Sequence, residues 1–355
     1  MNLSFYASLS ETGYGVAGYN IINALLKKNV TVSTFIAGQR VCPDCPPEVV
    51  ESASQSCQNF DNDAPFVKMW HQFDLINRVG KGSYLGWPIF ELDSFNEHEL
   101  FHLNVPDELI VCSNWAKEIM TNAGFANTHV VPLGVDNKIF FPAGTNNEDG
   151  PYKFFTAGKW ETRKGHDVLI NCFSKAFDNN DDVELHLLTH NPFLNEEQTK
   201  YWMSLCASSK LANKILIYDR VQSQKDVAAF INKCDCGIFP SRAEGWNLEL
   251  LESMSCGKPV ITTNNTAHID YCNSSNAHLI DTPNKELAHD GKWFFGQGNW
   301  AELDLDEEEQ LIEYMRQCYR DRPDNPAGLE TARQFSWDNS ANILTGVLDG
   351  ITCGV

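Results

Sequence analysis

The sequence has little positive charge and no long apolar run. It contains 27 lysines and arginines against 47 aspartates and glutamates, which gives a formal net charge of −20. An acidic chain repels polyanions, so we expect no nucleic-acid partner, and docking on an anionic membrane is disfavoured although a peripheral contact stays open. No stretch of about 18 apolar residues occurs, so no transmembrane segment is expected.

The chain also lacks a leader-like start, sequence repeats and low-complexity tracts. It begins MNLSFYA, without a charged start before a long apolar stretch, which predicts a buried strand instead of a signal peptide. The twelve cysteines fall mostly within apolar or helical segments, as Cys172 and Cys206 do. Because this placement is typical of buried reduced thiols, we expect a cytoplasmic protein.

What the chain does contain is a regular alternation of two kinds of segment. Apolar segments of strand length alternate with segments of helical period over most of its 355 residues. This alternation predicts an α/β fold of two doubly wound, Rossmann-like parallel-sheet domains. The polar, turn-rich segment 142–151 is interpreted as the linker, so the expected domains are residues 1–142 and 151–337.

The segment from Pro240 to Val260, PSRAEGWNLELLESMSCGKPV, carries the most specific pattern. A strand ends where the segment begins, and we expect a helix whose first turn holds Glu244 to Asn247. The free backbone N–H groups of a helix start suit an anion. Glu244 and Glu252 would then lie about 12 Å apart along the helix axis, which fits two contacts with one extended ligand.

A second pattern, GKWETRKG at residues 158–165, follows an expected strand at 152–157. It lies at the carboxyl end of a strand, where open α/β sheets bind ligands. Its three cations stand out in such an acidic chain, and Lys159 and Lys164 are placed to bind a diphosphate as point charges.

A third, glycine-rich pattern, ETGYGVAG at residues 11–18, follows the first expected strand. Glycines there let backbone N–H groups approach a phosphate or a sugar. The segment fits a dinucleotide fingerprint poorly, because no acidic residue ends a second strand about 20 residues further on. This mismatch argues against a nicotinamide-dependent dehydrogenase.

Together these segments resemble the retaining glycosyltransferase family 4 over nearly the full chain. Three further segments are similar to family motifs: VPLGVD with FFP at 131–142, YLGWPIFEL at 84–92 and FSW at 335–337. The resemblance implies a GT-B fold, in which two Rossmann-like domains face a central cleft. It also implies that a C-terminal helix, here about 338–355, packs back on the first domain.

The resemblance assigns roles to four charged residues. Lys159 and Lys164 would neutralise the diphosphate of a nucleotide-sugar donor, which stabilises charge developing in the transition state. Glu244 would bind hydroxyls of the donor sugar, and Glu252 would bind the ribose hydroxyls. The chain departs from the family at Lys159, where members often have Arg, and at Trp246-Asn247, where many have a small residue or Phe and then Gly.

Backbone groups complete the implied donor site. Asn247 and Leu248 would contact the sugar or phosphate, and Gly13 and Gly15 would close over the β-phosphate. The implied reaction moves a hexose from a UDP- or GDP-linked donor to an acceptor hydroxyl with retention of configuration, without a metal or other cofactor. The implied acceptor is a saccharide or glycoconjugate. A sugar-nucleotide epimerase, a phosphorylase and an inactive sugar-nucleotide-binding module stay open as alternatives.

Several other residues carry side chains suited to binding or metal ligation. His71 and Glu91 are candidates for acceptor contacts in the first domain. Cys42, Cys45 and Cys57 with His71 offer only an incomplete zinc pattern, so thiols in a loop are favoured over a metal site.

Two acidic pairs and one aromatic run are interpreted structurally. The Asp-x-Asp segments at 61–63 and 304–306 lie in polar, acidic stretches, and the second suits a helix start better than a metal site. The aromatic run WFF at 293–295 is interpreted as core packing in preference to a sugar platform.

Overall fold

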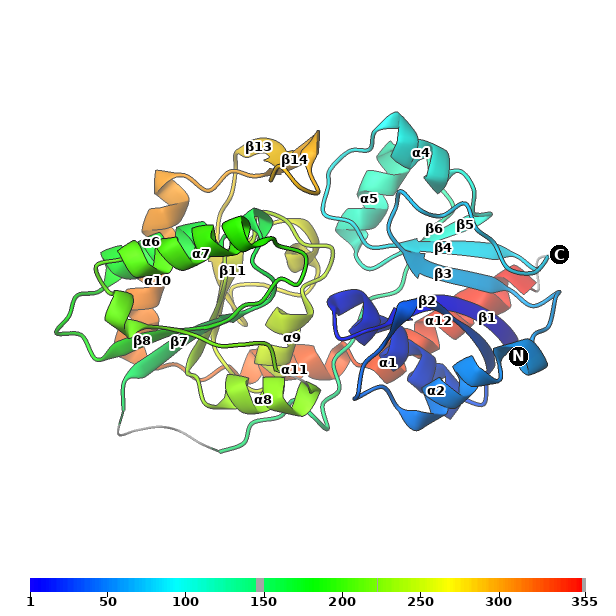
Figure 1. Ribbon diagram of the computed structural model, residues 1–355, viewed down its shortest axis with the longest axis horizontal. Helices are drawn as coiled ribbons and strands as arrows, with labels where there is room; N and C mark the ends of the chain where they lie inside the picture. The colour runs from blue at the N-terminus through cyan, green and yellow to red at the C-terminus, as the bar shows by residue number, and fades with distance from the viewer. Residues whose placement is uncertain (145–149, 222, 353–355) are drawn as a thin grey trace. The chain divides into compact units, whose positions relative to one another are not determined.

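The chain divides into two compact units (Figure 1), and the computed structural model describes residues 1–144, 150–221 and 223–352. The first unit is Met1–Asp136 with Gln334–Val355, and the second is Asn137–Arg333. The second unit therefore begins ahead of the expected linker, 142–151. Residues 145–149 of that linker, and the last three residues of the expected C-terminal helix, lie outside the described residues.

The first unit is built around a six-stranded parallel sheet with the order β2-β1-β3-β4-β5-β6. Its strands are β1 Asn2–Leu9, β2 Thr31–Val41, β3 Phe66–Trp70, β4 Tyr84–Pro88, β5 Glu108–Val111 and β6 Thr128–Val130. Its helices are α1 Gly13–Lys27, α2 Pro47–Ser54, α3 Ser56–Asn59, α4 Glu97–Leu103, α5 Asn114–Asn122 and α12 Trp337–Thr352.

Local sequence explains the elements of this unit. Strand β4 is buried along its whole length, as expected of an inner strand covered on both faces. The hydroxyl of Ser113 accepts a hydrogen bond from the Ala116 N–H at 3.1 Å and so caps α5, as a serine before a helix commonly does. Leu344 and Leu348 of α12 are fully buried, and this helix packs on α1 (red beside blue in Figure 1).

The second unit contains another six-stranded parallel sheet, with the order β12-β11-β10-β7-β8-β9. Its strands are β7 Tyr152–Ala157, β8 Val183–Leu188, β9 Ile215–Ile217, β10 Cys236–Phe239, β11 Val260–Thr263 and β12 His278–Ile280. Its α-helices are α6 His166–Ala176, α7 Glu196–Ser208, α8 Gln224–Asn232, α9 Leu248–Ser255, α10 Leu305–Asp321 and α11 Pro326–Gln334. Short 3₁₀ turns occur at η1 Thr162–Lys164, η2 Ala212–Lys214 and η3 Thr266–Asp270.

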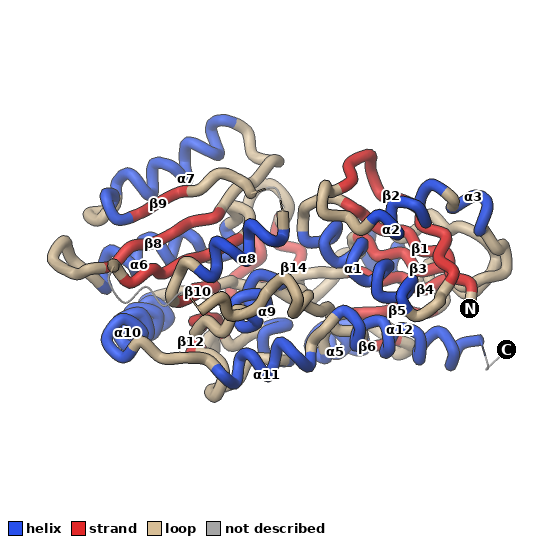
Figure 2. Tube along the Cα trace, turned by 90° about the horizontal axis from the view of Figure 1, so that it is seen from below, coloured by secondary structure: helices blue, strands red, loops and turns tan. Residues whose placement is uncertain are grey.

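Each sheet has one place where the order of its strands reverses. In the first unit this switch point lies between β1 and β3, and in the second it lies between β7 and β10. The tube in Figure 2 shows the strands of each sheet with their flanking helices. Open α/β sheets bind ligands at the carboxyl ends of the strands beside such a switch point, so each unit has one favoured place for a site.

An antiparallel hairpin in the second unit was not expected from the sequence. It pairs β13 Lys285–His289 with β14 Phe295–Ala301, and it contains the aromatic run interpreted above as packing. Among the described residues, every helix is too short or too polar to span a bilayer. The eleven cysteines within the described ranges are all free thiols, and ten of them are buried.

Candidate active site

The loop between β7 and α6 begins and ends with a glycine in the left-handed region. Gly158 has φ 131° and Gly165 has φ 70°. A Cβ atom at Gly165 would lie 2.0 Å from the carbonyl oxygen of Pro240, so only glycine lets this loop pack against the end of β10. The close approach brings the two predicted charged segments, 158–165 and 240–252, together at the switch point of the sheet.

Buried ion pairs join these two segments. The Arg163 guanidinium donates to a Glu244 carboxylate oxygen and to a Glu161 carboxylate oxygen, both at 2.8 Å. The other oxygen of Glu161 lies 2.7 Å from the Lys159 ammonium nitrogen. The Ser241 hydroxyl donates to Glu244 at 2.8 Å. Glu244 and Arg163 are both buried, so each charge depends on its partners for stabilisation.

Lys164 is the second ligand of the Glu244 carboxylate. Its Nζ atom lies 3.0 Å from Glu244 Oε1 and 3.6 Å from Glu249 Oε2, and only 9% of its side chain is exposed. Burial opposes the charge of this lysine, but the carboxylates of Glu244 and Glu249 outweigh it and raise the pKa of Lys164. Burial likewise opposes the charge of Glu244, yet Arg163 and Lys164 hold the pKa of its carboxyl well below its usual range.

Glu252 stands in the opposite electrostatic situation. It lies on α9 and is buried, and no ion pair or hydrogen bond to its carboxyl group is found among the described residues. Burial, followed by the nearby charge of Glu249, raises the pKa of Glu252 well above its usual range. The raised pKa favours the protonated form of the carboxyl, which can both donate to and accept from hydroxyl groups.

Asn247 ends the loop before α9 in a left-handed conformation, with φ 77°. Its side-chain oxygen caps the helix by accepting from the Leu250 N–H at 3.2 Å, and its amide nitrogen lies 3.0 Å from His268 Nε2. Burial lowers the pKa of His268 to about 4, so its imidazole is neutral and Nε2 accepts from the Asn247 amide.

The helix therefore starts later than the sequence predicted. The expectation that Glu244 to Asn247 form its first turn is wrong, because the left-handed backbone of Asn247 precedes the first helical residue, Leu248. Glu244 lies in the loop, so the distance expected along a helix axis does not apply to it. The backbone N–H groups of Leu248 and Glu249, in the first turn of α9, have no intrahelical acceptor.

The ion pairs at this switch point join three cations with three carboxyl groups. Lys159, Arg163 and Lys164 pair with Glu161, Glu244 and Glu249, whereas burial favours the neutral form of Glu252. Lys159 has 37% of its side chain exposed, so it is the cation with room to turn toward a ligand. The arrangement suits an anionic ligand, because cationic side chains are already held in place by their carboxylate partners before the ligand binds.

The glycine-rich segment of the first unit lies at the other switch point, where β1 leads into α1. A Cβ atom at Gly15 would lie 1.9 Å from the carbonyl oxygen of Ser10, whereas a Cβ at Gly13 would have no atom within 4 Å. Gly15 is therefore required by packing, and the space at Gly13 is open. Thr12 provides no side-chain cap to α1, and the first N–H groups of this helix have no intrahelical acceptor.

Tyr14 connects the two acceptor-side candidates with this segment. Its ring lies 4.6 Å from the His71 ring, and its hydroxyl donates to the Ile89 carbonyl at 2.7 Å. Burial, followed by the charge of Glu91, raises the pKa of Tyr14 well above its usual range. His71 also stacks on Phe73 with 4.9 Å between ring centroids. The structure thus brings Gly13, Gly15, His71 and Glu91 to one edge of the first sheet.

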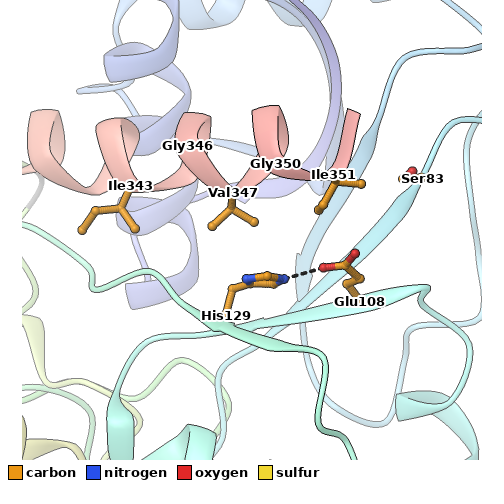
Figure 3. A pocket seen from close by; sticks show the side chains of 8 residues that line it. All are labelled: Ser83, Glu108, His129, Ile343, Gly346, Val347, Gly350 and Ile351. Carbon is orange, nitrogen blue, oxygen red and sulfur yellow. Dashed lines mark hydrogen bonds and ion pairs between the residues drawn. The ribbon is translucent and has the colours of Figure 1, made fainter. Parts of the chain in front are cut away.

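A large open cavity lies elsewhere in the first unit. It has a volume of about 710 Å³, and Figure 3 shows side chains of α12 on one wall and the paired Glu108 and His129 opposite them. Its lining residues are Ser83, Glu108, His129, Ile343, Gly346, Val347, Gly350 and Ile351. Glu108 begins β5, so this cavity lies by the amino ends of the strands, away from the switch point.

Metal-binding patterns find no geometric support in the described part of the chain. No group of three or more His, Cys, Asp or Glu side chains there is placed to hold a metal ion. Asp304 instead caps α10 in a reciprocal arrangement with Glu307. Cys42 and Cys45 are buried free thiols, and Cys57 is an exposed one.

Sequence reasoning missed four residues that organise these sites: Arg163, Arg242, Tyr14 and His268. Arg163 is one of the three cations in the segment 158–165, but the sequence did not show that it would lie between two carboxylates. Arg242 donates to the Thr162 carbonyl at 2.7 Å and to both Asp167 carboxylate oxygens at 3.0 Å. The signal for both arginines was present, because an arginine beside buried carboxylates in an acidic chain indicates an internal ion pair.

With this geometry in view, comparison with known proteins places the chain in a family. The family model described as glycosyl transferases group 1 matches residues 137–317, about half of the chain. A probable sucrose-phosphate synthase from Thermosipho melanesiensis is 30% identical over 164 residues, 43% of this chain and 36% of that protein. A D-inositol 3-phosphate glycosyltransferase from an Arthrobacter species is 26% identical over 149 residues, 40% and 35% of the two chains. The chain belongs to the family of glycosyl transferases group 1.

Solved structures match over the whole length. Sucrose-phosphate synthase from Thermosynechococcus elongatus superposes with a TM-score of 0.74 and 13% identity, covering all of both chains. The Anabaena protein HepE, solved with UDP-glucose, gives a TM-score of 0.74 and 15% identity over 99% of this chain and all of that one. The predicted family and the α/β fold with two Rossmann-like sheets, as in GT-B glycosyltransferases, are confirmed. This chain spans about a third of the length of the curated relatives it matches.

Proposed function

We propose that this protein is a retaining, metal-independent glycosyltransferase of family 4 that takes a hexose from a nucleoside-diphosphate sugar. The observation that carries the proposal is the buried cluster in which Lys164 and Arg163 share the Glu244 carboxylate, with the buried Glu252 on the helix that follows. These groups lie at the carboxyl end of a Rossmann-like sheet, at its switch point. The names of the relatives, which include sugar-phosphate synthases and mannosyltransferases, support a hexosyl donor.

The donor's diphosphate is proposed to bind Lys159 and Lys164. Lys159 turns from Glu161 toward the phosphate, and Lys164 stays fixed between Glu244 and Glu249. Their charges stabilise the negative charge that develops on the leaving diphosphate, which is the task a metal ion performs in other transferases. The first N–H groups of α9, at Leu248, and the cap residue Asn247 complete the anion site.

Glu244 and Glu252 are proposed to bind the two sugars of the donor, the transferred hexose and the ribose. Glu244 accepts hydrogen bonds from hydroxyls of the transferred hexose, and its position is fixed by Arg163 and Ser241. Glu252 binds the ribose hydroxyls, for which a protonated carboxyl offers both a donor and an acceptor.

The reaction is proposed to proceed with retention and without an enzyme nucleophile. An oxygen of the leaving diphosphate takes the proton of the acceptor hydroxyl on the same face of the sugar, so no side chain has to act as a general base. Gly13 and Gly15 of the first unit would contribute backbone N–H groups to the β-phosphate, and His71 and Glu91 would contact the acceptor. The buried free thiols support a cytoplasmic location as part of this proposal.

The first test is nucleotide binding with Lys164→Ala, compared with Lys175→Ala as the matched control on the surface of α6. The thermal midpoint is measured with UDP, GDP, UDP-glucose and GDP-mannose. A ligand at about 100 times its Kd adds about 2.7 kcal/mol of stability. We expect stabilisation of the wild type by one nucleotide family, its loss in Lys164→Ala and its retention in Lys175→Ala. Absence of stabilisation in the wild type would contradict the proposal.

Release of the nucleoside diphosphate separates an enzyme from a binding module. The wild type with its stabilising donor is expected to release the diphosphate slowly to water and faster with saccharide acceptors. Binding without release would favour an inactive module. Conversion of the donor sugar without release would favour an epimerase.

A further inference from the structure

The hairpin β13–β14 exposes large aromatic side chains that a packed core would bury. Trp293 is 47% exposed, Phe295 is 67% exposed, and Phe193, in the loop after β8, is 48% exposed. The interpretation of residues 293–295 as packing holds for Phe294, whose ring lies 4.8 Å from the Trp300 ring. It does not hold for its two neighbours. We call Phe193, Trp293 and Phe295 the aromatic platform.

The inner side of the hairpin is fixed to the body of the second unit. Trp300 and Ala288 are fully buried, and Glu286 accepts from Arg242 Nε at 2.8 Å. The same Arg242 donates to the Thr162 carbonyl in the loop that carries Lys159 and Lys164. The base of the hairpin and the proposed phosphate loop are thus held by one guanidinium group.

The tip of the hairpin is also rigid. One carboxylate oxygen of Asp290 accepts from three backbone N–H groups, those of Lys292, Trp293 and Phe294, at 2.8–3.0 Å. The Lys292 ammonium donates to the Phe193 carbonyl and lies 3.3 Å from the Gln198 side-chain oxygen. These contacts hold the exposed rings in place without covering them, so little entropy would be lost when a ligand binds.

Ring contacts run from the platform to the proposed donor site. The Trp293 and Phe193 rings meet edge to face with 5.9 Å between centroids. The Lys159 ammonium lies 5.6 Å from the Phe193 centroid. Trp293 and Phe193 therefore connect the platform with the cation that is proposed to bind the diphosphate.

We propose that the aromatic platform binds a saccharide and holds it as the acceptor for the transfer; this rests on the proposed function. The C–H faces of a pyranose pack on the negative face of an aromatic ring, and the hydroxyls at its edge need polar partners. Lys292, whose ammonium lies 5.8 Å from the Trp293 centroid, and His289, whose ring lies 6.2 Å from the Phe295 ring, supply such partners. A lipid membrane fits less well, because the net charge of −20 repels anionic surfaces.

The experiment compares Trp293→Ala and Phe295→Ala with the wild type, and uses Phe101→Ala as the control. Phe101 lies on α4 of the first unit and is 61% exposed, so it matches the exposure without belonging to the platform. The acceptors are maltotriose, mannobiose and sucrose, with the donor that the nucleotide test selects. We expect the KM for the accepted saccharide to rise about tenfold in both platform variants, the loss expected for one aromatic contact. Donor hydrolysis in water should stay within about twofold of the wild type, and Trp293→Phe should restore most of the affinity.

Saturation-transfer NMR with the same saccharides and no donor tests the platform separately from the transferase activity. Signal from a saccharide that weakens in Trp293→Ala but not in Phe101→Ala supports the proposal even if every donor fails. Three results would overturn it: unchanged acceptor KM in the platform variants, no saturation transfer to the wild type from any saccharide, or sedimentation with phosphatidylcholine–phosphatidylglycerol vesicles that Trp293→Ala abolishes.

Discussion

The two switch points of this protein occupy equivalent places in their sheets but are built from different chemistry. The one between β7 and β10 holds three cations and three carboxyl groups in an ion-pair network whose centre, Arg163 with Glu244, is buried. The one between β1 and β3 holds glycines, an aromatic cluster around Tyr14 and the ion pair of Glu11 with Arg40. The switch point between β7 and β10 therefore offers charged groups to a ligand. The one between β1 and β3 offers open space and the surface of aromatic rings.

This contrast shows that two copies of one topology can offer different chemistry at equivalent switch points. A buried charge network is costly to build and depends on every partner, so it is sensitive to the loss of a single charge. A surface of glycines and aromatic rings requires the backbone to pack closely against its neighbours, so it is sensitive to a substitution that adds volume. Substitutions that remove charge in one unit and add volume in the other test this difference directly.

The largest effect is expected from Glu244→Gln in the second unit. The change leaves the buried Arg163 and Lys164 with a neutral amide in place of their shared carboxylate. Breaking a buried ion pair on one side costs about 3–5 kcal/mol of folding free energy. Urea unfolding followed by circular dichroism measures the loss.

Glu249→Gln is the control, because Glu249 is partly exposed and lies 3.6 Å from Lys164. We expect a loss below about 1 kcal/mol for it. An equal loss in the two variants would mean that the network is not centred on Glu244.

The second effect is steric and belongs to the first unit. Gly15→Ala places a Cβ on the Ser10 carbonyl, so α1 and the β1 loop must separate, at a cost of about 2 kcal/mol. Gly13→Ala is the matched control, since its Cβ meets no atom within 4 Å, and its effect on the unfolding free energy should stay within about 0.5 kcal/mol. A Gly13→Ala variant as unstable as Gly15→Ala would contradict this account of the loop.

The smallest effect is a pH dependence at Glu252. Because the pKa of this buried carboxyl is raised in the folded state, the folded protein holds a proton that the unfolded chain releases above its ordinary pKa of about 4.3. Stability therefore falls as pH rises from that value toward the raised pKa. Glu252→Gln removes the penalty.

Thermal melts of the wild type and Glu252→Gln between acidic and alkaline pH measure this difference. We expect equal midpoints at acidic pH and a gain for the variant of about 2–4 °C at alkaline pH, which corresponds to roughly 1 kcal/mol in a domain of this size. A lower midpoint for the variant at alkaline pH would show that an ionised Glu252 has partners and stabilises the fold.

The strand–helix rhythm could be predicted because the inner strands are short segments rich in apolar residues and bounded by turn residues. Ser113 and the helix Glu196–Ser208 follow from the same local signals. The hairpin β13–β14 could not be predicted in this way, because its exposed aromatics remove the alternation of apolar and polar residues that marks a half-buried strand.

In the candidate site, too, features set by neighbouring residues could be predicted, whereas contacts between residues far apart in the sequence could not. The sequence placed Lys159, Lys164, Glu244 and Glu252 in two segments whose approach follows from the switch point. It did not show that Arg163 would join them, since that residue bonds to a partner 81 positions away. Nor did it show that Asn247 would interrupt the helix, because the buried partner of its side chain, His268, lies 21 positions further along the chain.

The chain crosses between its two units twice, near Asp136 and near Arg333, so the second unit is inserted into the first. The Val135 N–H donates to the Phe335 carbonyl, so the two segments that flank the insertion are hydrogen-bonded to each other. On the ribosome the second unit is complete before α12 has been made. The first unit must wait with one face of α1 uncovered until α12 has been made, so the nascent chain depends on α12 for protection from aggregation.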